Sequence, residues 1–230
     1  MVGERGRGGM RVRSSQSKRS NTSTVRRRGP GRPPNSDSET TKLAILDAAI
    51  DCFGDGGFSG TSSQTIADAA GVSAPTIYHH FVNKRGLYVA AFQYSVDIAW
   101  SRYADAATSA GNSLLDELVA VVHAAVKIMQ DRPTMTMLAI RAAIDLGPGE
   151  VDRAVPDEMM SRMALRAVAR GELDVDDVDY VGPLVEMVLW GVSVVGSRGG
   201  ANTQRDCEQA IDLMLHGKLV HRPTRRRRTG

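Results

Sequence analysis

The chain has 230 residues, 42% of them hydrophobic, which is enough for one or two domains with a buried core. Its net charge of +3 is uneven: residues 1–35 carry +9 and residues 222–230 carry +5, which leaves −11 for the rest. No run of about 18 apolar residues and no signal peptide is evident, so we expect no membrane span. Two cysteines far apart in sequence, Cys52 and Cys207, favour a reducing cytoplasm over a disulfide framework.

Residues 1–35 are rich in Gly, Ser, Arg and Pro, and we expect this basic arm to be disordered. Basic ends on an acidic body favour binding to a polyanion, although such tails also confer solubility. Within the arm, the tripeptide at 31–33, GRP, resembles an AT-hook core. An extended segment of this kind fits a narrow A·T minor groove, whose negative potential attracts arginine. Arg32 is therefore a candidate minor-groove contact, and a simple phosphate-binding tail is the alternative.

The first helix is expected to begin near Ser36, which has capping-box spacing with Glu39. Four apolar residues then recur at helical spacing: Leu43, Leu46, Ile50 and Phe53. The glycines at positions 54, 56 and 57 are expected to end this helix. Phe58 follows them and is expected to fill the core of the unit that the next helices form.

Residues 61–85, TSSQTIADAAGVSAPTIYHHFVNKR, have the layout of a helix-turn-helix. Two short helices are expected at about 64–70 and 74–81. In the turn between them, Gly71 suits the left-handed residue that ends one helix, and Ser73 suits the N-cap of the next. If Ile77 and Phe81 pack inward as an i,i+4 pair, the outward residues are those that a major-groove helix would use: Pro75, Thr76 and His79.

This region resembles the DNA-binding domain of the TetR (tetracycline-repressor-like) regulators, through TIADAAGVS, PTIYHHF and NKR after an amphipathic helix that ends in glycines. The resemblance covers about residues 40–94. It implies that Pro75 and Thr76 face bases, with His80 left open. It also implies a set of phosphate-holding residues: Thr61, Ser73, Tyr78, His79 and Lys84. Ser63 is a further candidate, because hydroxyls and free backbone N–H groups at the start of the second helix could hold a phosphate. Ala74 departs from the family pattern, which often has a polar or basic residue there, so base readout at that position is in doubt.

The rest of the chain is predicted to be helical, with no strand pattern. Asn83 is the expected N-cap of a linking helix that continues to about residue 100. Five more helices are expected at about 114–130, 133–146, 156–170, 176–196 and 203–216. The stretch at 184–195, LVEMVLWGVSVV, is apolar on nearly all sides and needs cover on all sides. The resemblance implies that the last two helices pair with their copies in a homodimer; the alternative is that this helix is the centre of its own domain.

The resemblance also implies a small-molecule pocket between the C-terminal helices, which are rich in methionine, a residue that suits adaptable cavities. The candidate lining residues are His123, Met129, Met137, Ile140, Ile144, Met163, Met187 and Trp190. Ordinary core packing is the alternative for each of them. Few charged residues fall on the inner faces, so a lipophilic effector is favoured.

No set of residues for catalysis or metal binding is predicted. The adjacent pair His79 and His80 diverges by about 100° on a helix and does not form a natural metal pair. The DVDDVD run at 174–179 lacks the glycine turn and closing glutamate of a calcium loop, and suits a helix N-terminus. We therefore expect no enzyme activity, metal or cofactor.

Together these patterns predict an all-α fold, a three-helix helix-turn-helix domain followed by a larger helical ligand-binding and dimerisation domain. The expected segments are a basic arm at 1–35, a DNA-binding domain at 36–86, a helical domain at 101–217 and a basic tail at 218–230. The expected function is a cytoplasmic, nucleoid-associated repressor that binds a palindromic operator as a homodimer and responds to a small effector. The alternative is an architectural, sequence-tolerant DNA-binding protein driven by its basic tails.

Overall fold

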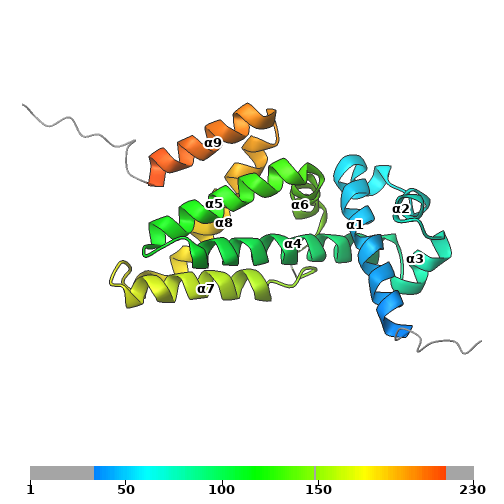
Figure 1. Cartoon of the computed structure of the whole chain (residues 1–230), viewed down its shortest axis with the longest axis horizontal. Helices are drawn as coiled ribbons and strands as arrows, with labels where there is room; N and C mark the ends of the chain where they lie inside the picture. Colours follow the sequence, from blue (N-terminus) through cyan, green and yellow to red (C-terminus); the bar gives the residue numbers. More distant parts are fainter. Residues whose placement is uncertain (1–33, 148, 216–230) are drawn as a thin grey trace, which may run out of the picture.

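The computed structural model describes residues 34–147 and 149–215, and over this part the regular elements are all helical (Figure 1). A 3-10 turn at Val175–Asp177 precedes the eighth α-helix. The α-helices are α1 (Pro34–Gly60), α2 (Ser63–Ala70), α3 (Ala74–His80), α4 (Lys84–Ser109), α5 (Leu114–Asp131), α6 (Pro133–Asp145), α7 (Ala154–Ala169), α8 (Val178–Gly196) and α9 (Gly200–Leu215). The predicted all-α fold class is confirmed.

Helices α1, α2 and α3 gather at one end of the molecule around the first turns of α4 (Figure 1). The aromatic centre of this unit is Phe53, which lies edge-on to Tyr88 of α4 with ring centroids 4.9 Å apart. Phe58 packs against the same tyrosine at 5.2 Å, as expected from its place after the glycines. The side chains that the three helices bury therefore share one core with the start of α4, which fixes how α2 and α3 are presented.

The expectation that glycines 54, 56 and 57 end the first helix is confirmed, because the helix breaks at Gly57 and a second short helical segment carries α1 on to Gly60. Gly57 has φ 69° and ψ 176°, which a side chain would oppose. Gly54 has a different role, since a Cβ there would lie 2.2 Å from the carbonyl oxygen of Thr134 on α6. Its missing side chain allows the backbones of α1 and α6 to meet. The start at Pro34 fits the preference of proline for the first helical turn.

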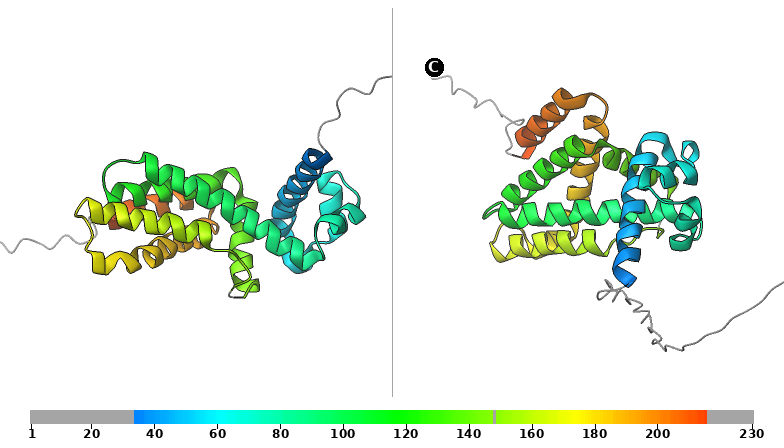
Figure 2. Two further views of the ribbon diagram at one scale, coloured as in Figure 1. Left: turned by 90° about the horizontal axis from the view of Figure 1, so that it is seen from below. Right: turned by 45° about the vertical axis from the view of Figure 1, so that its right-hand side comes forward.

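Helix α4 connects the two ends of the molecule, because it runs on to Ser109 rather than ending near residue 100 (Figure 1). As predicted, Asn83 caps it, with the side chain accepting a hydrogen bond from the Gly86 N–H at 2.8 Å. Helices α5, α6 and α7 pack on α4, and α8 packs on α5 and α7. Figure 2 shows α9 on the outside of this bundle, where it contacts α5 and α8.

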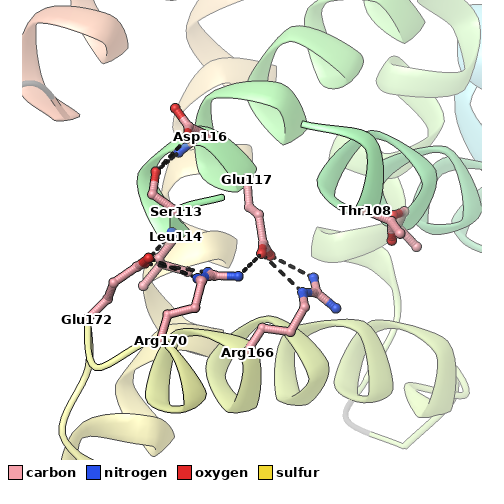
Figure 3. Close-up of polar contacts among 9 residues, drawn as sticks. Thr108, Ser113, Leu114, Asp116, Glu117, Arg166, Arg170 and Glu172 are labelled. Atoms are coloured by element: carbon pink, nitrogen blue, oxygen red, sulfur yellow. Dashed lines mark hydrogen bonds and ion pairs between the residues drawn. The ribbon is translucent and has the colours of Figure 1, made fainter. Parts of the chain in front are cut away.

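The end of the bundle remote from α1–α3 is held by a polar cluster between α5 and α7 (Figure 3). The side chain of Glu117 is only 1% exposed and accepts hydrogen bonds from Arg166 at 2.6 and 3.0 Å and from Arg170 at 3.0 Å. Glu172 also accepts from Arg170, at 2.8 Å, and from the Leu114 N–H at the start of α5. A buried carboxylate requires such partners, so the cluster fixes α5 against the end of α7.

Helix α8 is the most apolar of the described helices. By length and composition alone, Val175–Gly196 could cross a membrane, with a mean hydropathy of 1.5. The expectation of no run of about 18 apolar residues still holds, because acidic residues at 176, 177, 179 and 186 interrupt this segment. In the fold, this helix contacts α5, α7 and α9, and Val181, Val185 and Val192 are buried among them. Its apolar character is thus used in packing the bundle and in an exposed face described below.

Candidate nucleic-acid interface and cavity

The turn between α2 and α3 has the geometry that the sequence predicted. Gly71 is left-handed, with φ 67° and ψ 31°, and the N–H of Val72 returns to the carbonyl of Ala67 at 3.0 Å. At the other end of α2, the Ser62 hydroxyl accepts a hydrogen bond from the Thr65 N–H at 3.0 Å and caps the helix. Both ends of α2 are therefore defined by local hydrogen bonds, which sets the angle at which α3 leaves the turn.

Helix α3 is anchored through one face. Ile77 is fully buried and Phe81, which ends the helix, is 7% exposed. Ser73 occupies the N-cap position with an extended backbone, but its hydroxyl bonds the hydroxyl of Thr76 at 2.8 Å instead of a backbone N–H. The cap position was thus predicted and the capping bond was not, because the hydroxyl three residues later competes for it.

The opposite face of α3 is open. Pro75, His79 and Tyr78 are exposed, the last at 51%, and Thr76 and His80 are half-buried. The rings of His79 and His80 lie 5.4 Å apart. The predicted base-facing residues and the predicted phosphate-holding residues of this helix therefore share an accessible surface with α2.

A hydrogen bond joins two of these residues across the turn, since the Tyr78 hydroxyl donates to Ser63 Oγ at 3.0 Å. Lys84 comes from the start of α4, with its Nζ 4.5 Å from the centroid of the Phe58 ring. That contact holds the ammonium group over the Phe58 ring.

Thr61 differs from the other predicted contacts because it is only 4% exposed. Its hydroxyl donates to the carbonyl oxygen of Cys52 at 2.8 Å, so the side chain is already used to join α1 to the start of α2. Arg32 lies outside the residues that the structure describes. Both assignments stay predictions.

Within the described ranges, 34–147 and 149–215, no three His, Cys, Asp or Glu residues gather as metal ligands. Cys52 and Cys207 are both free. Burial, together with Asp51 and Asp55, raises the pKa of the Cys52 thiol, which lowers its reactivity at neutral pH. The acidic run at 174–179 leads into the N-terminus of α8, as predicted.

A cavity of about 780 Å³ lies among α4, α5, α6, α7 and α8. Its volume is in the range of sites for drug-sized ligands. The deeper part is lined by buried residues, among them Ser95, Tyr103, Ile128, Met135, Thr136 and Leu189. The rim is exposed and includes Ala143, Asp152, Arg153, Met187 and Trp190.

Two of the eight predicted pocket residues, Met187 and Trp190, line this cavity. Met163 is fully buried in the main core, and Met129 packs with Val188 and Val192 in a separate cluster near α9. His123 and Ile144 are exposed, and Met137 and Ile140 are half-buried outside the lining. Six of the eight residues therefore lie outside the lining, because several of these methionines fill core space on other faces of the helices.

Helix α6 lines the cavity on one side and packs against α1 on another. Three groups of α6 or its N-cap reach α1: Arg132 pairs with Asp47 at 3.1 Å, Thr134 donates to Asp51 at 2.6 Å, and Arg141 donates to the carbonyl of Asp55 at 3.2 Å. Near the end of α6, Asp145 accepts a hydrogen bond from Tyr88 of α4 at 2.9 Å. We refer to these contacts as the α6 clasp. The sequence did not predict the α6 clasp, because these contacts depend on which helices pack together in the fold.

Helix α8 carries an exposed apolar face, which we call the α8 stripe: Tyr180, Leu184, Met187, Gly191 and Val195. The spacing of three or four residues places them on one side of the helix. Tyr180 is 69% exposed and Met187 is 66% exposed. On α9, Leu213 and Met214 are exposed as well. A surface of this composition is typical of a protein–protein contact.

Comparison with known proteins places the helix-turn-helix in a family. Residues 45–91 match the family model of bacterial regulatory proteins, tetR family. The transcriptional regulator RutR of Escherichia coli (strain K12) is 44% identical over 57 residues, which are 25% of this chain and 27% of RutR. The chain thus spans about a quarter of the length of this relative.

Two longer matches cover the helical domain. The transcriptional repressor ComR of the same strain is 26% identical over 204 residues, which are 83% of this chain and 93% of ComR. The solved structure of AibR, in complex with isovaleryl coenzyme A and operator DNA, matches 76% of this chain and 97% of its own with a TM-score of 0.56 at 21% identity. The fold is therefore shared over most of the described helices, and the match at residues 45–91 identifies the helix-turn-helix as that of bacterial regulatory proteins, tetR family.

Proposed function

We propose that the protein is a DNA-binding transcriptional regulator that represses from a palindromic operator as a homodimer and responds to a small effector. The observation that carries this proposal is the open face of α3, where Pro75, Tyr78 and His79 are exposed while Ile77 and Phe81 anchor the helix. A short helix anchored in this way presents side chains to the edges of bases in a major groove. The family match to residues 45–91 supports the same assignment.

In this proposal, Pro75 and Thr76 meet base edges, and a surrounding set holds phosphates: Ser63, Ser73, Tyr78, His79 and Lys84. Phosphate contacts fix the register of the protein on the duplex, and base contacts give sequence preference. The hydrogen bonds from Tyr78 to Ser63 and between Ser73 and Thr76 orient these groups before DNA arrives. Thr61 would contribute a phosphate contact only by giving up its bond to Cys52. Arg32 would enter the adjacent minor groove.

The division of the chain follows from this assignment. Residues 36–86 would form the DNA-binding domain, α4 the link, and residues 101–217 the domain for effector binding and dimerisation. The segments at 1–35 and 218–230 would add basic contacts to the DNA backbone. The protein would act in the cytoplasm, at the nucleoid.

Dimerisation is supported by the α8 stripe. A two-fold axis beside α8 would bring this stripe, and the exposed Leu213 and Met214 of α9, against their copies. The cover that the apolar 184–195 segment needs on its outer side would then come from the second chain. Two α3 helices related by a two-fold axis require a palindromic operator, because each meets an equivalent half-site.

Effector response is supported by the position of α6, which lines the cavity and also forms the α6 clasp with α1. A ligand that wedges α6 or α4 outward would move α1 through Arg132 and Thr134, and would change the separation of the two α3 helices. The ligand must bind one arrangement better than the other, because equal affinity shifts no equilibrium. AibR, whose solved structure holds both a coenzyme A thioester and operator DNA, supports such coupling on this fold.

Binding-site selection from randomised duplex DNA tests the proposal. The whole chain is compared with a chain lacking residues 1–35 and with a Thr76→Ala variant. We expect both the whole and the shortened chain to enrich one palindrome, with weaker binding by the shortened chain, and Thr76→Ala to relax the preference within each half-site. Enrichment of A·T-rich DNA without symmetry, lost on deletion of the arm, would instead establish an architectural protein.

A further inference from the structure

The cavity is lined by two nearly buried side chains whose hydroxyl groups have no hydrogen-bond partner among the described residues. Tyr103 on α4 and Thr136 on α6 both line it, and each is 9% exposed. In the part of the chain that the structure describes, neither hydroxyl makes a hydrogen bond, whereas the neighbouring Ser95 donates to the carbonyl of Phe92 at 2.7 Å. Neither oxygen is completely enclosed by protein, since the buried side-chain polar atom without a partner among the described residues is Arg141 Nε, so both hydroxyls are open to the cavity. Two unpaired hydroxyls beside one empty volume therefore indicate a ligand that supplies hydrogen-bond acceptors or donors.

The charged groups of the cavity are already paired with protein groups. Arg153, the cation among the described lining residues, bonds Glu186 and also reaches Asp157 at 3.3 Å. The remaining lining carboxylate, that of Asp152, accepts a hydrogen bond from the Ala154 N–H at 2.9 Å. An anionic ligand would have to displace Glu186 from Arg153 and would also meet two carboxylates. Because Asp152 and Arg153 lie on the exposed rim, the deeper part of the cavity offers no cation, and burying an unpaired charge there is far more costly than burying a neutral polar group.

The rest of the lining is apolar or aromatic, including Phe92, Val96, Trp100, Leu146, Val151 and Leu189. Trp100 lies edge-on to Tyr103, with ring centroids 5.5 Å apart, and so fixes the position of the phenol ring. Burial raises the pKa of Tyr103 to about 12, so its hydroxyl stays protonated and can donate across the physiological range.

We propose that the cavity binds a neutral, largely apolar molecule that carries a carbonyl or similar acceptor, held by the hydroxyls of Tyr103 and Thr136. The proposal rests on the proposed function only where it treats this molecule as the effector, because binding itself is a property of the protein without DNA. It also distinguishes this cavity from a site for an acyl coenzyme A. The phosphates of coenzyme A require cations, and the described lining offers only the already paired Arg153.

The two tryptophans of the chain, Trp100 and Trp190, both line the cavity, so intrinsic fluorescence reports on it directly. The full chain, without DNA, is titrated with methyl decanoate, with decanoate and with decanoyl coenzyme A. These probes share one acyl chain and differ in charge. We expect saturable quenching or a spectral shift with the ester, and binding of decanoate and of the thioester that is weaker by about tenfold or more.

Variants test the hydroxyls separately from the apolar lining. Tyr103→Phe and Thr136→Val are each expected to weaken ester binding about two- to tenfold, the range for one hydrogen bond. Tyr94→Phe, on the same helix but outside the lining, is the matched control and is expected to bind like the wild type. The two variants are independent, so misfolding of one, seen in its thermal unfolding, leaves the other as the test.

The proposal is overturned if decanoate or decanoyl coenzyme A binds as tightly as the ester, if no ester binding saturates, or if neither variant weakens it. These titrations contain no DNA, so a failure to bind the ester is a separate result from a failure to bind an operator. If the protein binds the ester but selects no operator, the proposal for the cavity stands and the proposed regulatory function is contradicted.

Discussion

The hydroxyl of Tyr78 on α3 donates a hydrogen bond to Ser63 Oγ on α2, at a distance of 3.0 Å. This bond crosses the turn at Gly71 and joins two residues that we assign to phosphate contacts. Tyr78 is 51% exposed, so the bond contributes little to stability compared with the burial of Ile77 beneath it. Its main effect is to hold the phenol over the start of α2, where on DNA binding Tyr78 would turn its one proton from Ser63 to a phosphate.

Replacing Tyr78 with Phe is therefore expected to weaken operator binding about three- to tenfold, because one charge-assisted hydrogen bond to phosphate is lost. The free energy of unfolding is expected to fall by less than about 1 kcal/mol. Fluorescence anisotropy with the selected duplex measures the affinity, and urea unfolding measures the stability. Tyr94→Phe on α4 serves as the matched control. Affinity equal to that of the wild type would remove Tyr78 from the interface.

The close approach of α1 and α6 at Gly54 can be tested by adding one methyl group. In Gly54→Ala the new Cβ would lie 2.2 Å from the Thr134 carbonyl, so the two helices must separate. We expect a loss of about 1–3 kcal/mol in stability, the usual cost of overpacking, together with weaker operator binding. Gly60→Ala, near the end of the same helix, has nothing within 4 Å of the new atom and is expected to be nearly neutral. Equal thermal unfolding of the two variants would contradict this account of α6.

The α8 stripe predicts the oligomeric state. We expect the wild-type chain to elute with twice its mass of 24.7 kDa in size-exclusion chromatography with light scattering. Leu184→Glu places a carboxylate in the centre of the stripe and is expected to give the monomer mass, because a buried unpaired charge opposes association. Leu165→Glu, on an exposed position of α7, is the matched control and is expected to leave the mass unchanged. A dimer that persists in Leu184→Glu would place the interface elsewhere.

The buried phenol of Tyr103 predicts a loss of stability at alkaline pH. Its pKa is raised from 10.0 to about 12, so the folded state holds this proton more tightly than the unfolded state does. The resulting stability is complete below pH 10 and is lost as pH rises toward 12. By pH 11, Tyr103 should account for a loss of about 1 kcal/mol.

Tyr103→Phe should remove this part of the loss. Urea unfolding of both proteins at pH 9 and pH 11 measures the difference. Parallel pH dependence in the two proteins would show that the phenol is solvated.

The helix-turn-helix was predictable because its determinants are local. The left-handed Gly71, the i,i+4 pair of Ile77 and Phe81, and the Asn83 cap each act within a few residues, so the sequence alone predicts them. The bounds of α5 and α6 followed from Pro133 and from apolar spacing for the same reason. The break of the first helix at the glycines was predictable in the same way, whereas the close approach at Gly54 was not, because it depends on a helix distant in sequence.

The cavity was less predictable because its lining comes from five helices. Tyr103 and Thr136 are a tyrosine and a threonine on amphipathic helices, and only the packing of α4 on α6 brings both to one cavity. The α6 clasp has the same origin, since Arg132 and Asp47 lie 85 residues apart. In contrast, the exposed side of α8 was anticipated, because a helix that is apolar on all sides needs more cover than one bundle provides.

A DNase footprint on the intergenic DNA beside the protein's own gene, repeated across a salt series, tests the central claim most directly. We expect two protected half-sites related by a two-fold axis and centred about one or more helical turns apart, with protection that survives moderate salt. Diffuse protection that follows A·T content and disappears as salt rises would contradict the claim. It would show that the basic ends of the chain, rather than α3, determine where the protein binds.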